Sequence, residues 1–117
     1  MTDCVVNRTV DIVSKKWVLL IILNIFKQGG KQRYSQIKNK LETITPKILS
    51  DRLKVLEKEK ILTKEIDNSS IPIKTFYSLT KKGEDLVQIV QGVKEWGLKW
   101  ECPNKHCSST NCKDCEY

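Results

Sequence analysis

The sequence predicts a single, mainly α-helical domain with one β-hairpin. Apolar residues recur at helical spacing over most of the 117 residues. In contrast, residues 61–80 ("ILTKEIDNSSIPIKTFYSLT") place β-branched and aromatic residues on both sides of an Asn-Ser-Ser tip, which is typical of strand, turn and strand. This hairpin directly follows a basic amphipathic helix that is itself preceded by a short helix. Two such helices followed by a hairpin wing predict a winged helix-turn-helix.

Local start and stop signals set the expected element boundaries. Gly29 and Gly30 end the second helix, where a left-handed turn costs no Cβ clash. Thr45 is the expected N-cap of the fourth helix, with Pro46 at its first position, and Thr80 is the expected cap of the last. Ser35 is expected to contribute to the start of the third. The predicted helices span residues 2–13, 15–27, 34–41, 46–60 and 81–100, and the predicted strands span residues 61–67 and 75–80.

Two parts of the chain are expected to differ in role. Residues 1–100 should form the winged helix-turn-helix domain with N- and C-terminal dimerisation helices, and residues 101–117 a cysteine-rich C-terminal tail. The second helix is apolar on nearly every side and should be the centre of the core.

Positive charge is concentrated in one segment. Between Lys27 and Lys64, eleven Lys and Arg residues stand against four acids, so 11 − 4 = +7, while ten basic and ten acidic residues cancel in the rest of the chain. A polyanion is the natural partner of such a segment, and nucleic acid is the commonest one. A solvated lysine-rich surface explains the charge equally well. The hairpin that follows the basic helix favours double-stranded DNA.

The outer face of the fourth helix is expected to lie in the major groove. Lys and Ser side chains there can read base edges, while Asp51 could accept from a cytosine amine or orient a neighbour. Arg52 is expected either to reach a phosphate or to brace the fold. The outward residues are Thr45, Lys47, Ser50, Asp51 and Lys54.

Phosphate contacts are expected from the start of the third helix and from the hairpin strands. The hairpin tip carries an acid and no arginine, which argues against a minor-groove probe there. The candidate phosphate-contacting residues are Arg33, Tyr34, Ser35, Lys38, Lys64 and Lys74.

The first and last helices are expected to form a dimer interface. Along the last helix, Leu86, Ile89, Val93, Trp96 and Trp100 recur at steps of three, four, three and four, which is a coiled-coil-like seam. A seam that ends in two tryptophans is more than a domain of this size needs for its own core. The competing interpretation is that both Trp rings close the monomer core.

In order and spacing, these segments resemble the HxlR-type winged-helix transcriptional regulators, relatives of the MarR-type regulators. The resemblance covers about residues 4–98. It implies a homodimer that binds pseudo-palindromic promoter DNA and often responds to oxidants or electrophiles through cysteine. This chain has Val5 where the family frequently has Pro, and its cysteine-rich tail is not part of the shared pattern. The matching pieces are Cys4, "KWVLLIIL" from Lys16, "GGKQRYSQIKNKLETITPKILSDRLKVLEKEKIL" from Gly29, "IPIKTFYSLTKKGEDL" from Ile71 and "VKEWG" from Val93.

Cys4 is a candidate redox-sensing thiol, because the dipole at the start of the first helix favours a thiolate. The equally weighted alternative is a small apolar residue in the dimer interface.

Four more cysteines are candidate metal ligands in the tail. They are separated by four, four and two residues, and four thiolates can hold zinc or an iron–sulfur cluster. Redox-active thiols and an idle tail are the alternatives. The candidate ligands are Cys102, Cys107, Cys112 and Cys115, with His106 as a further one.

Other classes of protein fit the sequence less well. No enzyme is expected, since the single histidine lies in the tail and no phosphate-binding Gly loop or serine elbow is visible. The N-terminus lacks the pattern of a signal peptide, which predicts a cytoplasmic protein. The longest apolar stretch, residues 17–26, is short of the roughly 20 residues that a membrane span needs. The alternatives to a regulator are a winged-helix module for protein contacts and a metal-binding protein without sequence-specific DNA binding.

Overall fold

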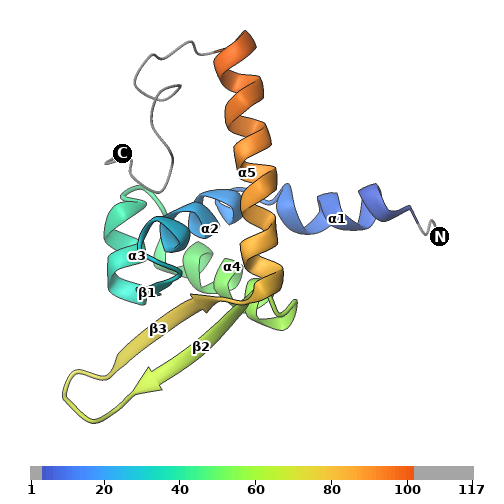
Figure 1. The fold of residues 1–117 in the computed structure, drawn as a ribbon. Coiled ribbons are helices and arrows are strands. Elements are labelled where there is room, and N and C mark those ends of the chain that lie inside the picture. Colours follow the sequence, from blue (N-terminus) through green and yellow to red (C-terminus); the bar gives the residue numbers. More distant parts are fainter. Residues whose placement is uncertain (1–3, 102–117) are drawn as a thin grey trace.

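The computed structural model describes residues 4–101. Its helices pack together, and a small antiparallel sheet lies at their edge with its hairpin projecting as a wing (Figure 1). The predicted mainly α-helical fold with a β-hairpin wing is confirmed. At opposite ends of the molecule, the wing and the C-terminal half of the last helix point away from the body. The elements are α1 (Val5–Val13), α2 (Val18–Lys27), β1 (Lys31–Arg33), α3 (Tyr34–Lys40), α4 (Pro46–Lys58), β2 (Leu62–Asp67), β3 (Lys74–Leu79) and α5 (Lys81–Trp100).

Helix α2 is the centre of the core, as its sequence predicts. Val18, Ile21, Ile22 and Ile25 are fully buried, and the helix contacts α1, α3, α5 and the sheet. The core is completed from α4 by Leu49, Leu53 and Leu56. The helix-turn-helix is therefore anchored through its apolar faces, which leaves its polar faces outward.

The predicted start of the second helix is wrong. Residue 15 was the expected first residue, but α2 begins at Val18 because Trp17 has a left-handed backbone (φ 82°) that no α-helix contains. The predicted end of the fourth helix at residue 60 is also wrong, since Lys60 is left-handed (φ 60°) and α4 ends at Lys58. For the first helix, residues 2 and 3 lie outside the described residues.

The sheet contains a strand that the sequence analysis does not predict. Strand β1 pairs antiparallel with β3, so β3 is the central strand in the order β1-β3-β2. Register places Gln32 and Lys64 on either side of Tyr77. Three residues are too few to show an alternation of their own, and only the pairing with β3 defines them as a strand.

The start of α5 is fixed against the turn between α4 and β2. The Thr80 hydroxyl accepts a hydrogen bond from the Gly83 N–H at 3.1 Å, which confirms the predicted cap, and donates to the Lys60 carbonyl at 2.6 Å. The Thr80 N–H donates to the Ile61 carbonyl at 3.0 Å. In addition, the Lys82 ammonium donates to the Glu59 carbonyl at 2.8 Å. We call this set of contacts, from residues 59–61 to residues 80–83, the α4–α5 joint.

None of the helices among residues 4–101 is long and apolar enough to cross a membrane.

Gly83 is required by the α4–α5 joint. A Cβ at this position would lie 2.4 Å from the Ile61 carbonyl oxygen and 3.0 Å from Leu79 Cδ2. We expect Gly83→Ala to lower the free energy of unfolding by about 2 kcal/mol, because the backbone must shift to admit the methyl group. Chemical denaturation of the purified chain measures this.

The matched control is Gly92→Ala in the same helix. A Cβ there meets no heavy atom within 4 Å, so alanine should raise the free energy of unfolding by about 0.5–1 kcal/mol through helix propensity. If the two variants were equally stable, the close approach at Gly83 would be contradicted.

Candidate nucleic-acid interface

Helix α4 has one buried face and one polar, mostly basic face. Lys47, Asp51 and Lys54 are exposed and Ser50 is half-buried, on the side opposite the buried leucines. These are the residues that the helical periodicity places outward. Their contacts with bases stay a prediction, but their accessibility is what a helix in a major groove requires.

Two residues of the predicted DNA-contacting set have structural roles. The Thr45 hydroxyl accepts from the Ile48 N–H at 3.2 Å and caps α4, as its position before Pro46 predicts. The Arg52 Nε donates to the Lys16 carbonyl at 2.9 Å, which ties the middle of α4 to the segment between α1 and α2. Of the two roles expected for Arg52, this contact supports the brace.

A second group of polar residues meets where α3, α4 and the wing come together. The N-terminal end of α3 is held by Gln36, whose Oε1 accepts from the Arg33 N–H at 3.2 Å; the Ser35 contribution expected there has no such contact among the described hydrogen bonds. A cavity of about 340 Å³ opens beside this end. Its lining residues are Arg33, Tyr34, Ser35, Ser50, Lys64, Ile73, Thr75 and Tyr77, and we call it the wing cavity.

The wing cavity gathers four of the predicted phosphate-contacting residues, Arg33, Tyr34, Ser35 and Lys64, together with Ser50 of α4. Lys38 and Lys74 do not line it. Lys74 pairs with Asp67 at the tip end of the ladder and lies one residue before Thr75, so strand alternation puts it on the opposite face.

Sequence reasoning missed the contribution of Ile73, Thr75 and Tyr77 to this cavity. Their spacing of two residues along β3 is the signal that could have found them, because alternate residues of a strand share a face. Burial, then the Glu57 carboxylate and then Tyr34 raise the pKa of Tyr77 above its usual 10.0. The shift favours the protonated phenol, which can donate a hydrogen bond.

On the outer face of the sheet, a lysine of β1 is paired with an acid of β2. The Lys31 ammonium is 2.7 Å from a Glu65 carboxylate oxygen and lies over the Phe76 ring, 5.0 Å from its centroid. Lys31 of β1 is therefore paired across the sheet with Glu65 of β2, and it is not among the predicted DNA-contacting residues.

The terminal helices expose a large apolar surface. On α5, Val87 and Val90 are buried, whereas Val93, Trp96 and Trp100 are 56, 58 and 65% exposed. The interpretation that both Trp rings close the monomer core is therefore wrong. On α1 none of the residues is buried, and Val5 and Val6 are 76 and 69% exposed.

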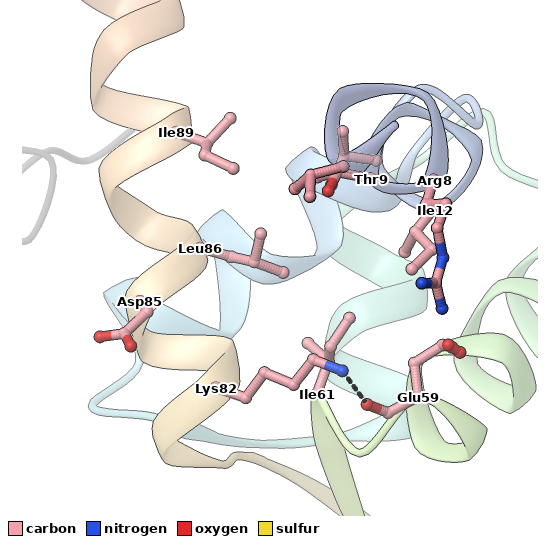
Figure 2. Close-up of a pocket in the computed structure, with 11 residues that line it drawn as sticks. Arg8, Thr9, Ile12, Glu59, Ile61, Lys82, Asp85, Leu86 and Ile89 are labelled. Carbon is pink, nitrogen blue, oxygen red and sulfur yellow. Dashed lines mark hydrogen bonds between the residues drawn. The ribbon is translucent and has the colours of Figure 1, made fainter. Parts of the chain in front are cut away.

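A groove of about 440 Å³ separates α1 from the first half of α5. Figure 2 shows Ile12, Leu86 and Ile89 on its two sides, with Ile61 at its base and the hydrogen bond from Lys82 to the Glu59 carbonyl at its edge. The apolar surface of the two terminal helices is thus continuous with the α4–α5 joint.

Cys4 is the N-cap of α1 and is exposed, with a free thiol. The candidate metal ligands Cys102, Cys107, Cys112, Cys115 and His106 lie outside the described residues.

A winged helix-turn-helix whose second helix exposes a polar, basic face defines the class of DNA-binding transcriptional regulators. The sequence model of the HxlR-like helix-turn-helix family matches residues 12–105. The chain belongs to this family, as its sequence motifs predict.

Comparisons with individual proteins agree with this assignment. The chain is 36% identical over 98 residues to YvaP, an HTH-type transcriptional regulator of Bacillus subtilis (strain 168), covering 84% of this chain and 88% of that protein. Its structure is similar to that of a MarR-family regulator of Porphyromonas gingivalis W83, with a TM-score of 0.76 and 29% identity over 86% of this chain and 95% of the other. It is also similar to the redox regulator HypR in its oxidized form, with a TM-score of 0.72 and 32% identity over 82% of this chain and 96% of HypR.

Proposed function

We propose that the chain binds pseudo-palindromic promoter DNA as a homodimer, with α4 of each subunit in the major groove and the wing cavity on the phosphate backbone. The observation that carries this proposal is the placement of exposed Lys47, Asp51 and Lys54 on one side of α4, next to a cavity lined by Arg33 and Lys64. Base-reading side chains and backbone-holding side chains then approach one duplex from the same side.

The apolar stripe on α5 supports the homodimer. Val93, Trp96 and Trp100 share one face of the helix and are more than half exposed. On α1, the exposed Val5 lines the same groove as Ile89 of α5. Exposed aromatic residues in a contiguous apolar patch are typical of protein interfaces. A second copy of the chain would cover this surface and place two α4 helices on half-sites about 34 Å apart.

Cys4 is the proposed sensor within this dimer. Its exposed thiol stands at the N-terminus of α1, the helix that we assign to the interface, so oxidation there would act on subunit packing rather than on α4 directly. The similarity to a protein named as a redox regulator supports this part of the proposal.

Phosphate contacts and base contacts should respond differently to mutation. With a duplex that the wild-type chain has selected from a randomised library, Lys38→Ala should reduce the slope of log affinity against log salt by about 0.9 for the one phosphate lost. Lys47→Ala or Ser50→Ala should instead change which sequences are selected, with base discrimination reduced by about 1–3 kcal/mol. Fluorescence anisotropy and repeated selection measure the two effects.

Lys81→Ala is the control, because Lys81 is an exposed lysine at the start of α5, outside the wing cavity and the outer face of α4. It should leave both the slope and the selected sequence unchanged. Wild-type behaviour of all the α3 and α4 variants would sink the DNA-binding assignment.

The apolar stripe of α5 should be required for the homodimer. Val93→Glu places a carboxylate in the proposed interface and should raise the dimer dissociation constant by at least about 30-fold, the effect of losing a central contact worth about 2 kcal/mol. Gln91→Glu adds the same charge at an exposed position of α5 outside the stripe and should remain dimeric. Analytical ultracentrifugation compares the two, and a Val93→Glu chain that dimerises like Gln91→Glu rules out this interface.

The Cys4 thiol should be required for a response to oxidation. Diamide should change the affinity of the wild-type chain for its selected duplex, and Cys4→Ser should abolish this response while leaving the reduced affinity unchanged. Diamide is reduced as it joins two thiols in a disulfide, so a variant with Ser at positions 102, 107, 112 and 115 should still respond by joining the Cys4 thiols of the two subunits. The reverse pattern would assign sensing to the tail.

A further inference from the structure

Arg52 of α4 binds a segment that lies far away in the sequence and outside the helix-turn-helix. Its half-buried side chain donates from Nε to the Lys16 carbonyl at 2.9 Å. Lys16 belongs to the turn of residues 14–17 that joins α1 to α2. The contact therefore links the helix that we assign to the major groove with a helix that we assign to the dimer interface.

The backbone of this turn presents the Lys16 carbonyl to Arg52. The carbonyls of residues 15 and 17, on either side, accept backbone N–H groups of α2 at 3.2 and 2.8 Å. Trp17 has a φ of 82°, and this angle sets the orientation of the peptide between residues 16 and 17 relative to α2. The Lys16 carbonyl is thereby available to α4, while its neighbours serve the start of α2.

The left-handed backbone of Trp17 is unfavourable for a residue with a large side chain, and it persists only where surrounding contacts hold it. The Trp17 ring packs against the core, and the Lys16 ammonium lies over it, 5.3 Å from its centroid. Backbone outliers of this kind cluster at functional sites. Because the chain before Trp17 turns with the peptide of residues 16 and 17, a rotation that redirects α1 also moves the Lys16 carbonyl.

Helix α1 has few other contacts that fix its orientation. None of its residues is buried, and Ile12 is the residue of α1 that packs against the core. A groove of about 440 Å³ separates it from α5, and Figure 1 shows it extending away from the body. The turn of residues 14–17 therefore largely sets the direction of α1.

We propose that Arg52 is a positioning residue that couples α4 to α1 through the Lys16 carbonyl. This inference rests on the DNA-binding function proposed above. A rotation of α1 about Trp17 breaks the bond to Arg52, and a shift of α4 in the major groove acts on the same carbonyl. The link works in both directions, as any coupling between two binding surfaces must.

A matched pair of variants at position 52 isolates the hydrogen-bond donor. Gln places an amide nitrogen where Arg has Nε, whereas Met places a methyl group there, and both substitutions remove the charge. The full chain is labelled with fluorotryptophan, and the fluorine NMR resonance of Trp17 is identified by its loss in Trp17→Phe. The duplex is the one that the wild-type chain selects from a randomised library.

Saturating duplex should shift the Trp17 resonance of the wild-type chain and of Arg52→Gln, and Arg52→Met should lose this shift. Arg52→Met should also bind the duplex about fivefold more weakly than Arg52→Gln, which corresponds to about 1 kcal/mol. The two variants should share one salt slope, because they carry the same charge. A residue with a merely structural role would lower the unfolding midpoint without removing the response at Trp17.

Lys54→Gln is the control for weakened DNA binding. It removes an exposed cation from the outer face of α4 and leaves Arg52 in place. It should lower the affinity and the salt slope but keep the Trp17 shift once the duplex is saturating.

The outcomes separate this coupling from the function on which it rests. Equal behaviour of Arg52→Gln and Arg52→Met overturns the coupling, whether both keep the shift or both lose it; if both also lower the salt slope by about 0.9, Arg52 acts through its charge on a phosphate. A wild-type chain that binds duplex without a shift at Trp17 overturns the coupling while DNA binding stands, and this result needs no variant. If the wild-type chain selects no duplex, both proposals fail.

Discussion

The α4–α5 joint is the constraint on which the rest of this molecule depends. It joins the C-terminal end of the proposed recognition helix to the N-terminal end of the proposed dimer helix through backbone groups: the Thr80 hydroxyl and N–H bind the carbonyls of Lys60 and Ile61. Gly83 lets the two segments approach until a Cβ would be 2.4 Å from a carbonyl oxygen. Apart from the Lys82 ammonium, these contacts are between main chains or short side chains, so they restrict the rotation of α4 relative to α5.

In the proposed homodimer, these contacts would let the terminal helices act on DNA binding. Arg52 fixes the middle of α4 to the Lys16 carbonyl, so α4 is held at its end by α5 and at its middle by the segment that follows α1. A change in how α1 and α5 pack with a second copy would therefore be transmitted to α4 as a rigid-body movement. A change in separation matters because a dimer must match half-sites about one helical turn apart.

Local signals in the sequence predict most of this fold. The caps at Thr45 and Thr80 and the helical periodicity correctly give α4 and α5, and the periodicity of α4 also gives its exposed face. What the sequence could not give depends on contacts between distant segments. Strand β1 exists only because β3 lies beside it, Trp17 is left-handed only in the folded chain, and the wing cavity needs α3, α4 and β3 together. The outer face of α4 could therefore be predicted, because it lies on one helix. The wing cavity could not, because its lining comes from several elements.

The net charge of +7 counted over residues 27–64 leaves out an acid that the fold brings to this segment. Lys31 belongs to the basic segment, but its partner Glu65 lies one residue beyond that segment, and the two are 2.7 Å apart in the sheet. Arg52 keeps its charge, but its Nε is directed to the Lys16 carbonyl. The charge of the segment and the charge that is free to pair with a phosphate therefore differ at Lys31. Exposed cations remain on the outer face of α4, at Lys47 and Lys54, and beside the wing cavity, at Lys64, which is why the proposed DNA contacts are assigned to these two surfaces.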